Sequence, residues 1–341
     1  MLLSNFIKKK FDAVLGRYEG NLEDYYFSQK DFPNIKVESY NIQGECKVSI
    51  SENINKKSID IKVDRPVNLV GNFYYYGEMN PNRLIIFDHG IGAGHMAYFK
   101  EIELLAQKGY TVYSYDHCGC VASGGDGIMG FAQGINDLDH VLSAILGDPR
   151  FKDVKIKLVG HSWGGYNAMN NARLHDEVTH VVSLAGFLSA RLLIEQYLPK
   201  FVMKYADEVM ERENKQNPKY ANMDARESIA RSRVKLLHIQ SKDDSMIKYD
   251  MSYTALESGL KGRESTVLMS VNNRDHDPFY TEKAVKLENE KISQQRILKK
   301  KGKLSTKEEQ DAFRQSYDWN AMSEEDMDIW QEIFDFLEDK I

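Results

Sequence analysis

The sequence predicts an α/β fold with a mostly parallel sheet, because strand-like and helix-like segments alternate from about residue 83 onward. The strand-like segments are short apolar runs, and the segments between them carry apolar residues at helical spacing. Strands are expected at residues 83–88, 110–115, 154–159, 180–186, 234–240 and 266–271. Strands that alternate with helices form a parallel sheet covered on both faces, so a single α/β domain is expected.

The helices expected between these strands cover residues 96–109, 135–147 and 167–174. Residues 35–75 contain short β-like runs separated by glycine and asparagine turns, which predict an antiparallel edge of the sheet. A final helix is expected to begin at a Ser323 cap and to face the core with an apolar stripe. This stripe contains Met327, Ile329, Trp330, Ile333, Phe334 and Leu337.

The chain divides into a short extension and one large domain. Residues 1–34 are expected to form a helical N-terminal extension, and residues 35–341 the α/β domain. Two stretches interrupt the alternation of strands and helices. Residues 187–232 are rich in helical patterns, and residues 281–320 are strongly charged. The charged stretch is most simply a helical excursion into solvent, because runs of charge are usually solvated.

The composition argues against two classes of protein. A net charge of −6 and a pI near 5.9 argue against a general nucleic-acid binder, which needs a basic surface. A mean hydropathy of −0.51 and the lack of a long apolar run exclude a membrane span.

An apolar helical face between Leu3 and Leu15 is expected to pack on the protein body, and a peripheral contact with a membrane surface or a partner is the alternative. The sequence does not specify the oligomeric state.

Cysteine usage indicates a reducing compartment. Cys46, Cys118 and Cys120 are odd in number and do not make a disulfide framework, so we expect reduced thiols in a cytoplasmic protein. The N-terminal lysines follow the apolar residues, which is the wrong order for a secretory signal. No further ligands accompany the cysteines at metal-binding spacing, and neither a metal nor an organic cofactor is expected.

The run Gly160-His-Ser-Trp-Gly164 matches the pattern G-x-S-x-G, with Ser162 at its centre. The pattern alone is weak, but here it follows an expected strand and precedes an expected helix. In that context the serine lies on a strained turn that exposes its hydroxyl, and the glycines leave room for the turn. Ser162 is therefore the predicted nucleophile.

A serine nucleophile needs a base to take its proton, and the base needs an orienting acid. After such a turn, the acid and the histidine follow in that order, each in a loop behind a later strand. Asp243 and Asp244 follow the strand at 234–240, and His276 follows the strand at 266–271. His276 is the predicted base and either aspartate the acid. The competing histidines are assigned to packing or surface positions: His140, His161, His175, His180 and His238.

The negative charge that develops on the carbonyl oxygen during such a reaction needs hydrogen-bond donors. One predicted donor is the backbone N–H of Trp163, the residue after the nucleophile. The second is the backbone N–H of Ile91, in the glycine-bearing loop His89-Gly-Ile-Gly92 that follows an earlier strand.

Taken together, these motifs resemble the α/β-hydrolase superfamily, and most closely its esterase, lipase-like and monoglyceride-lipase-like members. The resemblance covers about residues 67–280 and the final helix. It is carried by the loop at 88–94, the stretch 109–125, the serine turn and the run Ser241-Lys-Asp-Asp244-Ser-Met-Ile247. The last run is similar to the acid loop of the superfamily, which favours Asp244 over Asp243. Cys118 departs from the superfamily pattern, because an arginine is common there.

The resemblance implies an eight-stranded, mostly parallel sheet with helices on both faces. It also implies a helical cap between the sixth and seventh strands, here residues 187–232. The implied activity is hydrolysis of a small-molecule carboxylic ester through an acyl-enzyme, without a cofactor. Peptide or amide hydrolysis, a thioester substrate, and a non-catalytic binding protein with the hydrolase fold are the alternatives.

Overall fold

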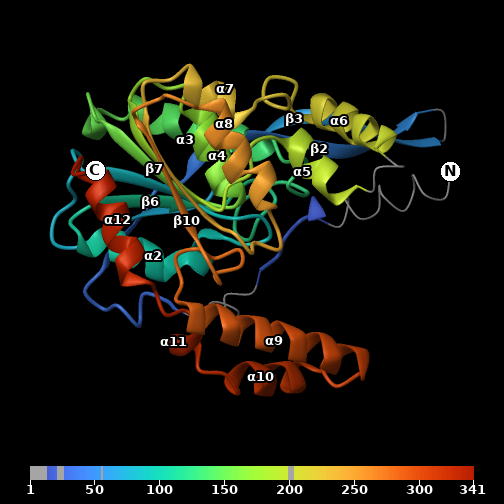
Figure 1. The fold of residues 1–341 in the computed structure, drawn as a ribbon. Helices are drawn as coiled ribbons and strands as arrows, with labels where there is room; N and C mark the ends of the chain where they lie inside the picture. Colours follow the sequence, from blue (N-terminus) through green and yellow to red (C-terminus); the bar gives the residue numbers. More distant parts are fainter. Residues whose placement is uncertain (1–13, 21–26, 55–56, 199–202) are drawn as a thin grey trace.

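The computed structural model describes residues 14–20, 27–54, 57–198 and 203–341 (Figure 1). Within these residues, a sheet of eight strands has the order β1-β4-β6-β5-β7-β8-β9-β10. β1 and β4 lie antiparallel at one edge, and the strands from β6 to β10 are parallel to one another. The predicted α/β fold with a mostly parallel sheet is therefore confirmed. The strands are β1 Lys36–Ser39, β4 Gly71–Tyr75, β5 Leu84–Asp88, β6 Thr111–Tyr115, β7 Ile156–His161, β8 Val178–Leu184, β9 Lys235–Ser241 and β10 Thr266–Val271.

Helices cover both faces of this sheet because successive residues of each central strand point to opposite faces. On β5, Ile85 and Phe87 belong to the apolar cluster that contains α2 and α12. Leu84 and Ile86 belong to the cluster that contains α3, α4, α7 and α8 (Figure 1). The described helices are α2 Phe99–Gln107, α3 Gln133–Gly147, α4 Trp163–Asn171, α5 Ala190–Tyr197, α6 Lys204–Gln216, α7 Ala225–Ala230, α8 Tyr253–Gly259, α9 Glu282–Lys300, α10 Lys307–Gln315, α11 Trp319–Met322 and α12 Met327–Leu337.

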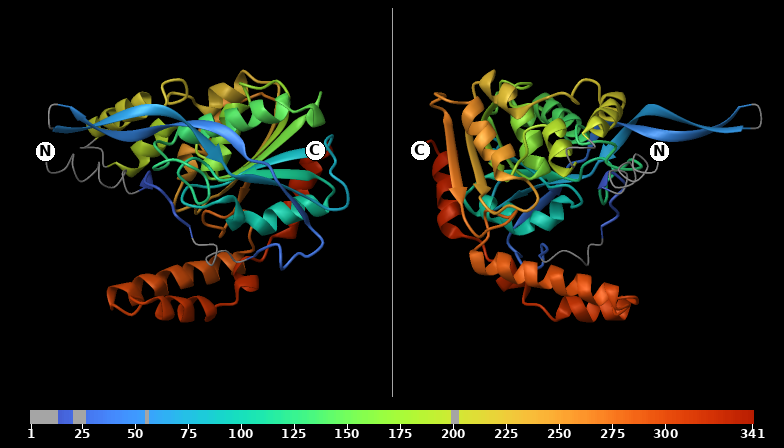
Figure 2. Two further views of the ribbon diagram at one scale, coloured as in Figure 1. Left: turned by 180° about the vertical axis from the view of Figure 1, so that it is seen from behind. Right: turned by 45° about the vertical axis from the view of Figure 1, so that its right-hand side comes forward.

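The antiparallel region at 35–75 is more elaborate than the sequence suggests. β1 and β4 join the main sheet, whereas β2 (Ile42–Ile54) and β3 (Lys57–Leu69) pair only with each other. Their register runs from Ile42 opposite Leu69 to Ile54 opposite Lys57, so the pair forms a long hairpin. Figure 2 shows this hairpin projecting from the body of the molecule. Ile42 and Leu69 are buried at its base and fix it to the core.

Most of the N-terminal helix predicted for residues 1–34 lies outside the described residues. The described part near Leu15 packs on the loop after β6. Tyr18 forms a β-bridge with Cys120, and the Arg17 guanidinium donates hydrogen bonds to the carbonyls of Val121, Ser123 and Gly125. This segment therefore packs against the body in an extended form.

The two interruptions of the alternation are both helical. α5, α6 and α7 lie between β8 and β9, which are the sixth and seventh strands of the main sheet in chain order. α9 and α10 lie side by side and extend from the body (Figures 1 and 2). No helix among the described residues is long and apolar enough to cross a membrane.

The predicted Ser323 cap of the final helix is wrong. α12 begins at Met327, and the Asp326 side chain accepts hydrogen bonds from the N–H groups of Asp328 and Ile329. Ser323 instead follows α11, where its hydroxyl donates to the Trp319 carbonyl. Met327 is the first residue of the helix and lies on its outer side, with 53% of its surface exposed. The rest of the stripe faces the core as expected, apart from the half-buried Ile329.

The packing of α12 gives a test of the core. Ile333 is fully buried against the sheet, so Ile333→Ala should lower the free energy of unfolding by about 2–5 kcal/mol. Met327→Ala on the same helix should change it by no more than about 0.5 kcal/mol. Chemical denaturation of both variants measures the difference, and equal losses would contradict this packing of α12.

Candidate active site

Ser162 lies between the end of β7 and the first residue of α4, in the centre of the sheet. Its backbone has φ 55° and ψ −112°, a conformation that residues with a side chain rarely adopt. Its N–H donates to the Leu184 carbonyl at 2.8 Å, which ties the turn to β8. The strained strand-to-helix turn expected from the motif is therefore present.

The two glycines of the motif are required by close backbone contacts. A Cβ on Gly160 would lie 2.3 Å from the Gly164 carbonyl oxygen. A Cβ on Gly164 would lie 1.9 Å from the Asp88 carbonyl oxygen. Neither position tolerates a side chain, so the glycines allow the turn to pack against β5 and against itself.

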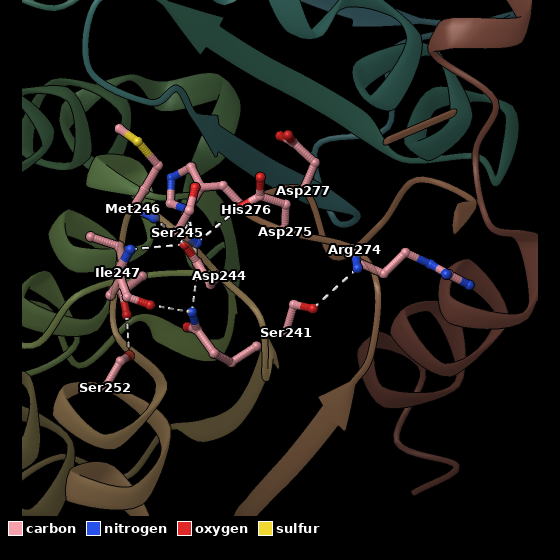
Figure 3. Close-up of polar contacts among 12 residues, drawn as sticks. Ser241, Asp244, Ser245, Met246, Ile247, Ser252, Arg274, Asp275, His276 and Asp277 are labelled. Carbon is pink, nitrogen blue, oxygen red and sulfur yellow. Dashed lines mark hydrogen bonds and ion pairs between the residues drawn. The ribbon is translucent and has the colours of Figure 1, made fainter. Parts of the chain in front are cut away.

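His276 and Asp244 face each other from the loops after β10 and β9 (Figure 3). His276 Nδ1 lies 3.1 and 3.0 Å from the two carboxylate oxygens of Asp244. The Asp244 carboxylate also accepts from the N–H groups of Met246 and Ile247, both at 2.8 Å, and from the Gln240 amide at 2.5 Å. These donors hold the buried carboxylate in one orientation toward the imidazole.

Asp243, the rival acid, has a different set of partners. Its carboxylate accepts from the Ser241 hydroxyl at 2.6 Å and from the Asn273 N–H at 2.8 Å. These contacts join the acid loop to the loop that carries His276, with no bond to the imidazole. The geometry favours Asp244 as the orienting acid.

The electrostatics of His276 suit a base. Burial lowers its pKa, but the hydrogen bond and negative charge of Asp244, together with the charges of Asp277 and Asp275, outweigh burial, and the net result is a raised pKa. Within the described chain, no hydrogen bond joins the hydroxyl of Ser162 to His276. Such bonds are often long without substrate and shorten when it binds.

The loop predicted to stabilise the oxyanion lies beside the nucleophile. A Cβ on Gly90 would lie 3.5 Å from the Ser162 Cβ. Among the described residues, neither the Ile91 N–H nor the Trp163 N–H donates to a backbone acceptor, so both are available to an incoming oxygen. His89 Nδ1 bonds the Gly90 carbonyl at 2.8 Å, and that carbonyl shares a peptide group with the Ile91 N–H. His89 therefore orients this predicted donor.

A buried charged network that the sequence reading missed lies behind the loop. His117 is bonded to Asp88 at 2.8 Å and to Asp137 at 3.1 Å, and all three are fully buried. Burial alone would lower the pKa of His117, but the two carboxylates raise it to about 9. His117 packs against Trp163 with ring centres 4.5 Å apart and ring planes tilted by 43°. The sequence signal for this network was the place of His117 shortly after an expected strand, within the stretch 109–125 that carries the resemblance.

The remaining histidines have partners of their own. His175 pairs with Asp139, His180 with Asp339, and the fully buried His238 with the Ser183 hydroxyl. His140 bonds the Asn136 carbonyl. His161 was expected to serve as packing only, but it bonds both Tyr98 and the His276 carbonyl.

Among the described residues, no group of His, Cys, Asp and Glu side chains could hold a metal ion.

The strand order and the serine turn at the end of β7 define the chain as an α/β-hydrolase. A family model described as serine aminopeptidase, S33, matches residues 79–267, which is more than half of the chain. The chain therefore belongs to this family. The predicted resemblance to α/β-hydrolases is confirmed.

Two solved structures of the Pyrococcus furiosus esterase Pf2001, from different crystal forms, are similar to this chain. One has a TM-score of 0.54 at 17% identity and covers 83% of this chain and 97% of the esterase. The other has a TM-score of 0.53 at 17% identity and covers 84% and 97%. At this identity the similarity shows a shared fold. A search of curated protein sequences found no match.

The contrast between the two aspartates yields a prediction. Asp244→Asn should lower the rate of labelling by a fluorophosphonate roughly a thousandfold to ten-thousandfold, because the carboxylate that orients and charges His276 is lost. The base must be neutral to accept a proton, so wild-type labelling should rise with pH through a midpoint above 6.5. Without Asp244, burial dominates the pKa of His276, and this midpoint should move to lower pH.

Asp243→Asn is the matched control. It alters a contact between loops but leaves His276 its partner, so the rate should fall less than about tenfold with the midpoint unchanged. A larger loss in Asp243→Asn than in Asp244→Asn would reverse the assignment of the acid.

Proposed function

We propose that this chain is a serine hydrolase that cleaves a carboxylic ester through an acyl-enzyme on Ser162. The observation that carries the proposal is the strained backbone of Ser162 at the carboxyl ends of the parallel strands, where the His276–Asp244 pair also lies. A strained backbone at a nucleophile presents its hydroxyl to substrate, and a paired imidazole takes the proton. A binding protein has no need for all three groups together.

In the proposed reaction, Ser162 Oγ attacks the ester carbonyl carbon while His276 Nε2 takes its proton. The N–H groups of Ile91 and Trp163 stabilise the resulting oxyanion. The bond to the leaving oxygen then breaks, and His276 returns the proton to the departing alcohol. Water repeats the sequence on the acyl-enzyme, which releases the acid and restores the serine. Asp244 stabilises the imidazolium in both halves.

We assign residues 187–232 to a cap over this site. Phe187, Ile194 and Leu198 from this segment share one apolar cluster with Ile91 and Trp163, which flank the proposed oxyanion site. Apolar side chains beside the proposed oxyanion donors suit the hydrocarbon part of a small-molecule substrate. The cap is joined to the acid loop, because Gln196 and Tyr197 both donate to the Met246 carbonyl at 2.6 Å.

A peptide or amide hydrolase is the second candidate, and the description of the matching family as serine aminopeptidase favours it. The same three side chains serve both reactions.

A cytoplasmic location also stays a prediction. It is supported by Cys46, Cys118 and Cys120, which are buried and form no disulfide.

A single set of assays tests the proposal. Wild type should react with a fluorophosphonate, and Ser162→Ala should lose labelling and about a millionfold in kcat. A short-chain p-nitrophenyl ester should be hydrolysed with a higher kcat/KM than an aminoacyl p-nitroanilide. Faster cleavage of the anilide would replace the ester proposal with the amide alternative. A folded wild type that never labels would reject serine catalysis altogether.

A further inference from the structure

A chain of three hydrogen bonds links the oxyanion loop, the serine turn and the base loop. The Gly90 N–H donates to the Tyr98 hydroxyl at 3.1 Å. The Tyr98 hydroxyl lies 2.8 Å from His161 Nδ1. His161 Nε2 lies 2.9 Å from the His276 carbonyl oxygen. The residue before the nucleophile is thus bonded, directly or through Tyr98, to both loops that serve the nucleophile.

The direction of each bond in this chain follows from the backbone groups at its ends and from the charge of His161. The His276 carbonyl can only accept, so His161 donates to it from Nε2. Burial and the neighbouring His276 lower the pKa of His161 to about 3, so the ring is neutral and its other nitrogen, Nδ1, is an acceptor. The Tyr98 hydroxyl therefore donates to Nδ1 and accepts from the Gly90 N–H.

Two further observations show that this contact is built into the site. A Cβ on Gly90 would lie 2.6 Å from the Tyr98 oxygen, although the φ angle of Gly90 does not itself demand glycine. The missing side chain is therefore needed for the approach of the tyrosine. His161 is also held by rings on two sides, with centres 5.2 Å from Phe279 and 4.9 Å from His276.

We infer that Tyr98 and His161 are positioning residues that hold Gly90, the residue before the oxyanion donor, and the catalytic histidine at fixed places relative to Ser162. The inference rests on the proposed function. Asp244 fixes the ring of His276, whereas His161 fixes its main chain. His89 holds the carbonyl of Gly90, whereas Tyr98 holds its N–H. Each catalytic group is thus constrained from two sides, as a site that stabilises a transition state requires.

The test is a steady-state comparison of ester hydrolysis. Tyr98→Phe removes one oxygen and keeps the ring, so kcat should fall about 10- to 100-fold while KM stays within about twofold. Tyr76→Phe is the matched control, because it removes a hydroxyl that bonds Glu103 on α2, away from the site. It should leave kcat unchanged. The melting temperature of both variants shows whether a loss of rate is a loss of fold.

A double-mutant cycle makes the test specific to this contact. Gly90→Ala should also lower kcat, because its new methyl group displaces the Tyr98 hydroxyl. In the Tyr98→Phe background that hydroxyl is absent, so Gly90→Ala should lower kcat much less than it does alone.

The His161 contacts are tested separately. His161→Gln, which keeps a donor and an acceptor, should retain more activity than His161→Leu. Nitrogen NMR at neutral pH should show the His161 proton on Nε2.

The outcomes separate this inference from the proposed function. If wild type is labelled on Ser162 while Tyr98→Phe keeps the wild-type kcat, the positioning role is overturned and the hydrolase stands. Additive losses in the cycle, or a His161 proton on Nδ1, overturn it in the same way. A folded wild type that never labels overturns the proposed function, and the positioning role falls with it.

Discussion

The left-handed backbone of Ser162 is the constraint on which the rest of the site depends. A residue with a side chain in this region costs about 1–2 kcal/mol, and the surrounding structure must hold it there. The Ser162 N–H bonds β8, and Gly164 packs under the Asp88 carbonyl at the end of β5. The turn is therefore held from both neighbouring strands, and the central sheet maintains the strain that exposes the hydroxyl.

Buried imidazoles around this turn take different charges because their partners differ. His117 lies between two carboxylates and is charged, with a pKa of about 9. His89 bonds only backbone groups, and burial followed by the charge of His117 lowers its pKa to about 4. His161 is also neutral, because burial and the neighbouring His276 lower its pKa to about 3. In the proposed reaction, His276 takes the serine proton while its nearest imidazole neighbour carries no like charge, and Asp244, Asp275 and Asp277 favour the charged ring.

Local patterns in the sequence were enough to predict the class of fold and the position of the serine turn. Both depend on short-range rules, namely the alternation of strands and helices and the space that Gly160 and Gly164 leave. The choice between Asp243 and Asp244 could not be made from the residues alone, because adjacent aspartates differ only in where the loop aims them. The sequence assigns His161 to packing, because its hydrogen-bond partners Tyr98 and His276 are far away in the chain. Ser323 satisfied the rule for a helix cap, but Asp326 satisfies it one turn later, and tertiary packing decided between them.

The acid loop joins two parts of the molecule that have different tasks. The N–H groups of Met246 and Ile247 bind the Asp244 carboxylate, while the Met246 carbonyl accepts from α5 of the proposed cap. A second contact of the cap is made by Glu213 on α6, whose carboxylate accepts from the N–H groups of Phe131 and Ala132 just before α3. Burial raises the pKa of Glu213 to about 7. Because α5 and Asp244 bond the peptide groups of one short loop, any displacement of α5 also moves the donors that orient the Asp244 carboxylate. The apolar cap that would receive the substrate and the carboxylate that would orient the base are therefore connected through this one loop.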